Sequence, residues 1–219
     1  MRRLIPPLVP GLLLALAACS PAPDKAPASS AAAPPPKRLP VTGLDVPPAT
    51  ARVEIDTGEG PIVLELDGRD APQSTANFLH YVDTGKLDGG TFYRAVRAGK
   101  SGFVQFNSGA RTYPPIPHEP TTRTHLSHTD GTISTARYAV GTASNEFTII
   151  VGDMTYLDAG GGATPDKQGY AAFGHVVSGM ETVRKILRAP LSKAKPAPGD
   201  WPDETLARPV VIVKAYRLK

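Results

Sequence analysis

One arginine stands out in this sequence because of its neighbours. The segment TFYRAV, residues 91–96, has the composition of a β-strand, and alternation along a strand predicts that Phe92, Arg94 and Val96 share one face. A buried charge without a partner costs several kcal/mol, so Arg94 must meet acceptors or water. Two interpretations follow. Arg94 reaches solvent or a carboxylate in a structural role, or it lines a groove where its fork of N–H donors meets a ligand.

The elements that must position Arg94 are mostly short strands. Alternation of apolar and polar residues predicts strands at 51–56, 61–67, 91–96, 102–106, 132–136, 146–151, 171–177 and 208–218. Helical spacing of apolar residues predicts two helices, within 71–87 and 179–187. Many short strands with glycine-rich connections indicate a closed antiparallel barrel or a β-sandwich, and periodicity alone does not choose between them.

Several segments, taken in order, resemble the cyclophilin family of peptidyl-prolyl isomerases. They read TFYRAV, GFVQF, HLSHTDGTISTAR, ASNEFTIIVGDMTYLD and GYAAFGHVVSGMETVRKI, and the correspondence covers nearly all of residues 53–219. The most specific parts are the aromatic-x-arginine at 92–94, the GTIS-A strand at 131–136 and FGHVVSGMETVRKI. The resemblance implies a mainly β fold, a closed eight-stranded antiparallel barrel capped by two α-helices, with the site on the outside of the barrel.

The resemblance also implies an activity, rotation about the peptide bond before proline. Amide resonance sets a barrier of about 20 kcal/mol, and lowering it requires no nucleophile, metal or other cofactor. It requires a donor aimed at the prolyl nitrogen and an apolar seat for the ring. The resemblance assigns the donor role to Arg94 and orientation of the carbonyl to Gln105. It assigns substrate binding to Phe92, Phe103, Ala136, Arg137, Glu146, Thr148, Tyr156, Leu157 and Tyr170.

The sequence departs from the family pattern at the seat of the proline ring. Thr148 stands in place of a phenylalanine, and Thr135 in place of a methionine. At about 0.8 kcal/mol per buried methylene, the loss of a phenyl group costs on the order of 2 kcal/mol of proline binding unless a neighbour fills the gap. Tyr156 and Tyr170 supply aromatic surface for that purpose. We therefore expect an isomerase whose activity is reduced.

Charged residues also depart from the pattern. Glu146 takes a glutamine position, and Arg137 replaces an asparagine that contacts the peptide backbone. We expect Glu146 to pair with Arg94 or Arg137, where it would compete with substrate for the guanidinium. The segment from Arg94 to Gln105 is longer than in the commonest family members, which leaves its register open.

The amino terminus predicts export and lipidation. Arg2 and Arg3 precede an apolar run too short to span a membrane, and Leu16-Ala17-Ala18-Cys19 resembles the lipobox of bacterial lipoproteins. Cys19 is the only cysteine, so it forms no internal disulfide. We expect a signal peptide at 1–18, a lipidated Cys19 opening a disordered Pro/Ala-rich tether at 19–50, and one domain at 51–219. Ser20 after the cysteine, with no aspartate there, resembles the pattern of outer-membrane lipoproteins. The expected location is the bacterial cell envelope, on the periplasmic side of the outer membrane.

The net charge and the clustering of certain residues bear on whether the protein binds nucleic acid, metal ions or other proteins. The net charge of +4 includes Arg2 and Arg3 and falls to +2 once residues 1–18 are removed, which does not favour nucleic acid. Histidines and Glu119 gather in HEPTTRTHLSH, residues 118–128, but their spacing matches no compact zinc pattern. Trp201 lies in a proline-rich excursion, where it either anchors the loop or contacts a partner. We expect a monomer that binds no metal and touches the membrane only through its anchor.

The function favoured by these observations is a membrane-anchored prolyl isomerase acting on proline-containing, unfolded or newly exported proteins at the cell envelope. The alternative is a cyclophilin-like module that binds peptides with weak or no catalysis, favoured by the polar Thr148 and Glu146 in the seat. A purely structural envelope lipoprotein is disfavoured by the presence of both Arg94 and Gln105.

Overall fold

The computed structural model describes residues 43–194 and 201–219. The predicted signal peptide, Cys19 and most of the tether therefore lie outside the described residues. The domain begins slightly before the predicted boundary at residue 51. Pro47 is buried beside Gly68, and the N–H of Arg69 donates to the carbonyl of Ala49 at 3.1 Å, so the end of the predicted tether packs on the barrel.

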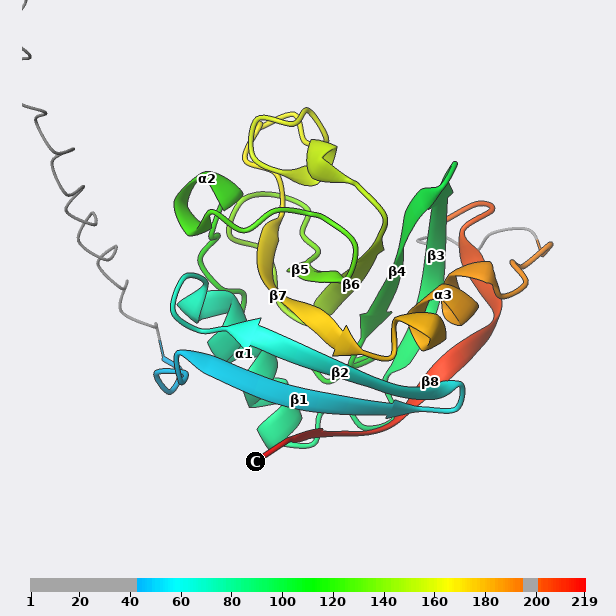
Figure 1. The fold of residues 1–219 in the computed structure, drawn as a ribbon, viewed down its shortest axis with the longest axis horizontal. Coiled ribbons are helices and arrows are strands. Elements are labelled where there is room, and N and C mark those ends of the chain that lie inside the picture. Colours follow the sequence, from blue (N-terminus) through cyan, green and yellow to red (C-terminus); the bar gives the residue numbers. More distant parts are fainter. Residues whose placement is uncertain (1–42, 195–200) are drawn as a thin grey trace, which may run out of the picture. The chain divides into compact units, whose positions relative to one another are not determined.

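Eight strands close into a barrel (Figure 1). In chain order they are β1 (Thr50–Thr57), β2 (Gly60–Asp67), β3 (Thr91–Ala98), β4 (Ser101–Asn107), β5 (Thr132–Thr135), β6 (Glu146–Val151), β7 (Ala171–Ser178) and β8 (Thr205–Arg217). The order around the barrel is β1-β2-β7-β5-β6-β4-β3-β8, and every neighbouring pair is antiparallel. The predicted strands and the closed barrel are confirmed.

The alternation read from the sequence fills the barrel interior. Val53 and Ile55 of β1 face Ile62 and Leu64 of β2, and all four side chains are fully buried. Glu54, between the first two, is partly exposed, as a period of two requires. The interior is therefore closed to ligands, and any binding surface lies on the outer face of the strands.

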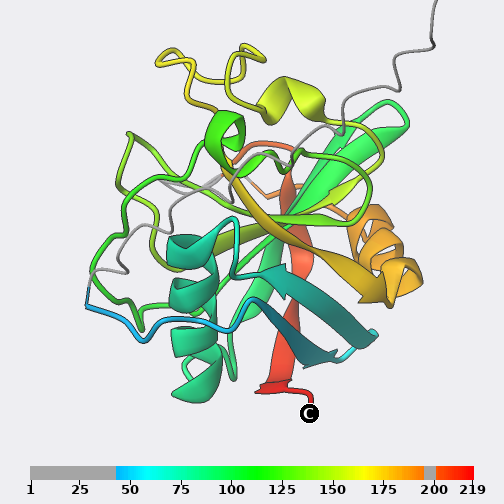
Figure 2. The ribbon, with the colours of Figure 1, turned by 60° about the vertical axis from the view of Figure 1, so that its left-hand side comes forward.

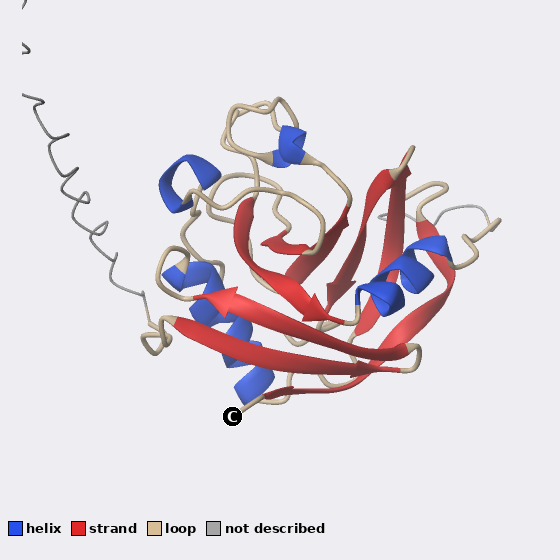
Figure 3. Ribbon diagram, viewed as in Figure 1, coloured by secondary structure: helices blue, strands red, loops and turns tan. Residues whose placement is uncertain are grey.

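Two helices cover opposite sides of the barrel, as Figures 1 and 2 show from two directions. Helix α1 (Pro72–Asp83) buries Phe78, Leu79 and Val82 in the core, and α3 (Met180–Arg188) buries Val183 and Ile186. A one-turn helix α2 (Thr121–Thr124) and a 3-10 turn η1 (Thr155–Leu157) add to the predicted pair (Figure 3). Among the described residues no helix is long and apolar enough to cross a membrane.

A buried carboxylate caps the start of α1 from a distant part of the chain. Glu119 is fully buried and accepts hydrogen bonds from the backbone N–H groups of Gln73 at 3.0 Å and Ser74 at 2.8 Å. Burial raises the pKa of Glu119, while these hydrogen bonds oppose the rise. Because the carboxylate satisfies the unpaired donors of a helix terminus, it fastens the connection between β4 and β5 to the barrel.

Candidate active site

A groove of about 640 Å³ opens on the outside of the barrel, over the outer faces of β3, β4, β5 and β6. All of the predicted catalytic and substrate-binding residues except Phe92 line it. The full lining is Tyr93, Arg94, Val96, Phe103, Gln105, Asn107, His128, Ser134, Ala136, Arg137, Tyr138, Thr142, Ser144, Asn145, Glu146, Thr148, Tyr156, Leu157, Ala163, Tyr170 and Trp201.

A β-bulge sets which side chains of β3 reach the groove. Phe92 pairs with Phe106 and Arg94 pairs with Gln105, so Tyr93 is an extra residue in the strand. The bulge turns Phe92 into the core, where it is fully buried, and leaves Arg94 on the outer face. The prediction that Phe92 and Arg94 share a face is therefore wrong, and Phe92 lies in the core instead of the groove.

The guanidinium of Arg94 is held from three sides. Its Nη1 donates to Gln105 Oε1 at 2.8 Å. Its Nε donates to Glu204 Oε2 at 2.7 Å, and Nη2 lies 2.5 Å from the same oxygen. The Trp201 ring lies over it, with Cζ 3.8 Å from the ring centroid, and Phe103 lies at 5.3 Å. The Arg94 side chain keeps 13% of its surface exposed, so it is an oriented donor at the groove.

Glu146 forms no ion pair within the described residues and accepts hydrogen bonds from neutral donors. Tyr93 donates its hydroxyl at 2.7 Å, Gln105 its Nε2 at 2.9 Å and Asn107 its Nδ2 at 2.8 Å. Burial raises the pKa of Tyr93, and the Glu146 carboxylate raises it further, so the phenol remains a donor. The predicted pairing of Glu146 with an arginine is wrong. Glu146 reaches Arg94 only through Gln105, whose amide it orients.

Arg137 directs its guanidinium into the protein. Its terminal nitrogens bond Asp166 at 2.8 and 2.9 Å, and two of its donors bond the carbonyl of Gly169 at 2.9 and 2.6 Å. The hydrogen bonds that Asp166 accepts from Arg137, from the Gln168 backbone and from Thr164 hold its pKa below its usual range. Because the Arg137 side chain is fully buried, its guanidinium fastens the loop that forms one wall of the groove. The Arg137 side chain is therefore engaged within the protein and does not make the predicted contact with substrate.

The apolar part of the groove is the candidate seat for a proline ring. Phe103, Ala163 and Tyr170 pack around a small cluster formed by Ile150, Met154 and Leu157. Ala136 and Tyr156 complete the lining, and Tyr156 is 47% exposed. Thr148 lies in the floor with 8% of its surface exposed.

Enlarging the side chain at 148 should strengthen peptide binding. We expect Thr148→Phe to lower the dissociation constant for an Ala-Pro peptide about tenfold, because a phenyl group adds apolar surface for the ring. An NMR titration of the two proteins measures this directly. Thr148→Ala is the matched control and should bind no more tightly than the wild type. Weaker binding by the phenylalanine variant would mean that neighbouring side chains already fill the seat.

Comparison with known proteins identifies the family. The chain matches the family model for cyclophilin type peptidyl-prolyl cis-trans isomerase/CLD over residues 52–216. It is 33% identical over 174 residues to peptidyl-prolyl cis-trans isomerase A of Dickeya dadantii, a match that covers 78% of this chain and 86% of the relative. The chain belongs to the cyclophilin family.

Further relatives agree with this cyclophilin assignment. The peptidyl-prolyl cis-trans isomerase of Acinetobacter baylyi is 34% identical over 148 residues, which cover 66% of this chain and 76% of the relative. A crystal structure of a cyclophilin type isomerase from Cryptosporidium parvum superimposes with a TM-score of 0.62 at 18% identity, covering 78% of this chain and 98% of that one. The barrel of this chain is thus a cyclophilin fold.

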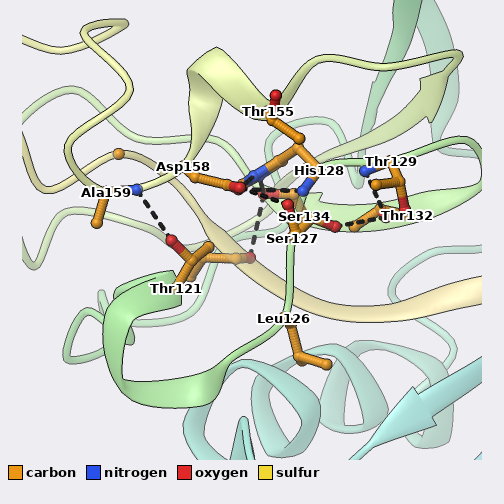
Figure 4. A network of polar contacts seen from close by, with 12 residues as sticks. Thr121, Leu126, Ser127, His128, Thr129, Thr132, Ser134, Thr155, Asp158 and Ala159 are labelled. Carbon is orange, nitrogen blue, oxygen red and sulfur yellow. Dashed lines mark hydrogen bonds and ion pairs between the residues drawn. The ribbon is translucent and has the colours of Figure 1, made fainter. Parts of the chain in front are cut away.

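A buried polar network lies beside the groove of this cyclophilin (Figure 4). His128 is fully buried between Asp158, whose Oδ1 lies 2.5 Å from Nδ1, and Ser134, whose Oγ lies 2.8 Å from Nε2. Serine, histidine and aspartate in this order have the contacts of a hydrolase triad. Ser134, however, is only 1% exposed and donates its hydroxyl to the carbonyl of Ala171 at 3.1 Å. The network therefore fixes β5 and the loop at Asp158 and supplies no nucleophile.

The histidine cluster around this network makes no metal site in the described parts of the chain. His118 contacts the carbonyl of Gln168 at 3.0 Å, while Glu119 caps α1 and His128 lies in the network above. Burial lowers the pKa of His118. Each of these three side chains thus has a place in the framework of the fold.

Asp158 should make the stability of the cyclophilin domain sensitive to acid. Burial alone would raise its pKa, but hydrogen bonds from His128 and Ser127 outweigh burial and lower it. A carboxylate whose pKa is lower in the folded state than in the unfolded state stabilises the fold at any pH above its unfolded-state pKa. This contribution is lost as the pH falls through the folded-state pKa. We expect Asp158→Asn to lower the free energy of unfolding at neutral pH and to lose less stability between about pH 5 and pH 2 than the wild type.

Urea unfolding across that pH range checks this expectation. Substitution of the exposed Asp45 by asparagine is the matched control, and its pH profile should follow that of the wild type. Identical pH profiles for Asp158→Asn and the wild type would contradict the assigned role.

Sequence reasoning missed several residues that this cyclophilin places at its groove. They are Tyr93, Asn107, Tyr138, Trp201 and Glu204. Trp201 carried one signal, as the only tryptophan in the chain. Glu204 carried none, because it meets Arg94 across a separation of 110 residues.

Proposed function

We propose that this protein is a peptidyl-prolyl cis/trans isomerase, anchored by lipid to the bacterial cell envelope, that acts on proline-containing segments of exported proteins. One observation carries the isomerase part: the Arg94 guanidinium is held beside Gln105 at an exposed groove with an apolar seat. The names of the relatives support the same reaction. A second structure of the Cryptosporidium isomerase, with a TM-score of 0.61, was determined in the presence of the dipeptide Ala-Pro.

The groove lowers the barrier by favouring the twisted amide. As the bond before proline rotates, resonance is lost and the lone pair becomes localised on the prolyl nitrogen. An N–H of Arg94 donates to that nitrogen, and this hydrogen bond is stronger in the twisted state than in either planar isomer. The ring remains in the seat between Phe103 and Leu157 while the chain on the other side of the bond turns. Gln105 keeps the guanidinium in place by accepting from Nη1.

NMR exchange spectroscopy on Ala-Pro peptides tests the activity. The purified full-length chain should accelerate cis/trans exchange, which is slow without a catalyst. Peptides that differ in the residue before proline show how the groove selects substrates. If a folded chain accelerates none of them, the isomerase proposal fails.

The envelope part of the proposal rests on the amino-terminal sequence. Residues 1–18 have the pattern of a signal peptide, and Cys19 follows Leu16-Ala17-Ala18 as in a lipobox. If the proline- and alanine-rich segment after Cys19 were fully extended at about 3.1 Å per residue, its roughly thirty residues would reach about 90 Å. An isomerase domain on such a tether samples a layer next to the membrane, where exported chains emerge unfolded. Ser20 after the cysteine supports the outer membrane over the inner membrane as its location.

Expression in a bacterial host tests the anchor. Mass spectrometry of the mature chain should show an amino-terminal Cys19 carrying acyl groups, and the protein should fractionate with the outer membrane. Cys19→Ser is the control and should leave the chain unprocessed and without acyl groups. A soluble mature chain that begins after Cys19 would exclude the anchor without affecting the isomerase proposal.

A further inference from the structure

The turn before β8 reaches the groove and contacts Arg94 with two side chains. Glu204 binds the Nε and Nη2 edge of the guanidinium, and the Trp201 ring covers one of its faces at 3.8 Å. The groove described so far has functional residues on β3 to β6 and the loops next to them. Trp201 and Glu204 therefore add a second contribution, from the end of the chain.

The backbone fixes this turn to the strand that carries Arg94. The carbonyl of Glu204 accepts the N–H of Ala95 at 2.8 Å, and Thr205 pairs with Arg94 in the β3–β8 register. Within the turn, the N–H of Glu204 and the hydroxyl of Thr205 both donate to the carbonyl of Trp201, at 3.2 and 3.1 Å. The contact with Arg94 is thus built into the sheet.

Arg94 lines the groove, and its contacts leave some of its terminal N–H groups without a partner among the described residues. A guanidinium has five N–H groups. One on Nε is donated to Glu204 and one on Nη1 to Gln105, while Nη2 forms an ion pair with Glu204 at 2.5 Å. Among the described residues, at least one N–H on Nη1 and one on Nη2 remain for a ligand. Glu204 and Gln105 hold different nitrogens of the guanidinium, and the Trp201 ring over it limits movement out of its plane.

We propose that Glu204 and Trp201 are positioning residues for catalysis, which clamp the guanidinium of Arg94 so that its remaining N–H groups face the prolyl peptide bond. This inference rests on the proposed isomerase function and assigns the turn 201–204 to it. A donor on a flexible arginine side chain would spend much of its time away from the prolyl nitrogen, and small misplacements of catalytic groups reduce rates strongly. The clamp acts on turnover more than on affinity, because the seat for the ring is formed by other residues.

Kinetics of the full-length chain test the clamp. We expect Glu204→Ala to lower kcat for an Ala-Pro peptide about tenfold while KM changes less than about twofold. Glu204→Asp, which keeps the carboxylate, should recover part of the loss, and Trp201→Phe should retain more activity than Trp201→Ala. The matched control is Glu181→Gln, an exposed glutamate of α3 that does not line the groove.

A measurement that does not depend on turnover separates this inference from the proposed function. In the wild type the Arg94 Nε–H should give a sharp NMR signal with slow rotation of the guanidinium, and Glu204→Ala should broaden or remove that signal. If the wild type is inactive but its Arg94 guanidinium rotates slowly, the isomerase proposal fails. The contacts of Glu204 and Trp201 with Arg94 would then be real but would have no role in catalysis. An active wild type whose Glu204→Ala variant is equally active, or faster, would overturn the clamp and identify Glu204 as a bystander or a competitor of substrate.

Discussion

Replacing Arg94 by alanine should reduce the acceleration of prolyl exchange by about 100- to 1,000-fold, the usual loss when a positioned donor to the transition state is removed. Arg94 lines the groove, and hydrogen bonds to Gln105 and Glu204 hold its guanidinium there. Exchange spectroscopy with saturating peptide measures the loss.

Arg94→Lys separates charge from geometry. An ammonium group keeps the charge but lacks the planar fork that bonds Gln105 and Glu204 while presenting further donors. We expect this variant to be impaired nearly as much as Arg94→Ala, and a lysine variant near wild-type activity would contradict the argument from geometry. We expect both variants to fold, because the Arg94 side chain lies on the outer face of the barrel. Urea unfolding of both variants checks this.

The strands and the two main helices could be predicted because their signals are local. Apolar residues recur at a period of two in a strand, as in Val53 and Ile55, and at helical spacing in a helix, as in Val183 and Ile186. Either pattern identifies the buried face of the element, whichever part of the protein that element packs against. Closure into a barrel is not local. Periodicity left a sandwich open, and only the resemblance to a family chose the barrel that the structure has.

Predictions about the site failed where pairing between strands decides the outcome. Simple alternation placed Phe92 and Arg94 on one face, but a bulge at Tyr93 reverses the faces, and a bulge is defined only by the partner strand. The same bulge brings the Tyr93 hydroxyl to Glu146. Glu146 was expected beside Arg94 or Arg137 because of its opposite charge, and it binds neutral donors instead.

Contacts distant in sequence were missed for the same reason. Glu204 reaches Arg94 because β8 pairs with β3, and nothing near Glu204 in the sequence indicates that partner. Arg137 was assigned to substrate because the family has a peptide-binding residue there. Its partners Asp166 and Gly169 lie in a loop whose path the sequence does not reveal.

An aromatic cluster inside the barrel supports the strand that carries much of the groove. Phe147 of β6 lies at its centre. Ring centroids of four other aromatic residues lie 4.9–6.1 Å from it, namely those of Phe78, Tyr81, Phe106 and Phe173. Its neighbours in the strand, Glu146 and Thr148, face outward into the groove. Strand β6 thus contributes core side chains from its inner face and groove side chains from its outer face.

Truncation of the Phe147 side chain should therefore lower the stability of the fold and leave the catalytic activity of the folded protein nearly unchanged. We expect Phe147→Ala to lower the free energy of unfolding by about 3–5 kcal/mol, because the fully buried ring leaves a cavity that the closed barrel cannot collapse to fill. Against a total of roughly 5–15 kcal/mol this is a large fraction. Urea unfolding measures it, and Phe147→Leu should lose less. Activity per folded molecule should change little, since Glu146 and Thr148 keep their outward face, and a large loss of kcat in the folded variant would show that core packing sets the geometry of the groove.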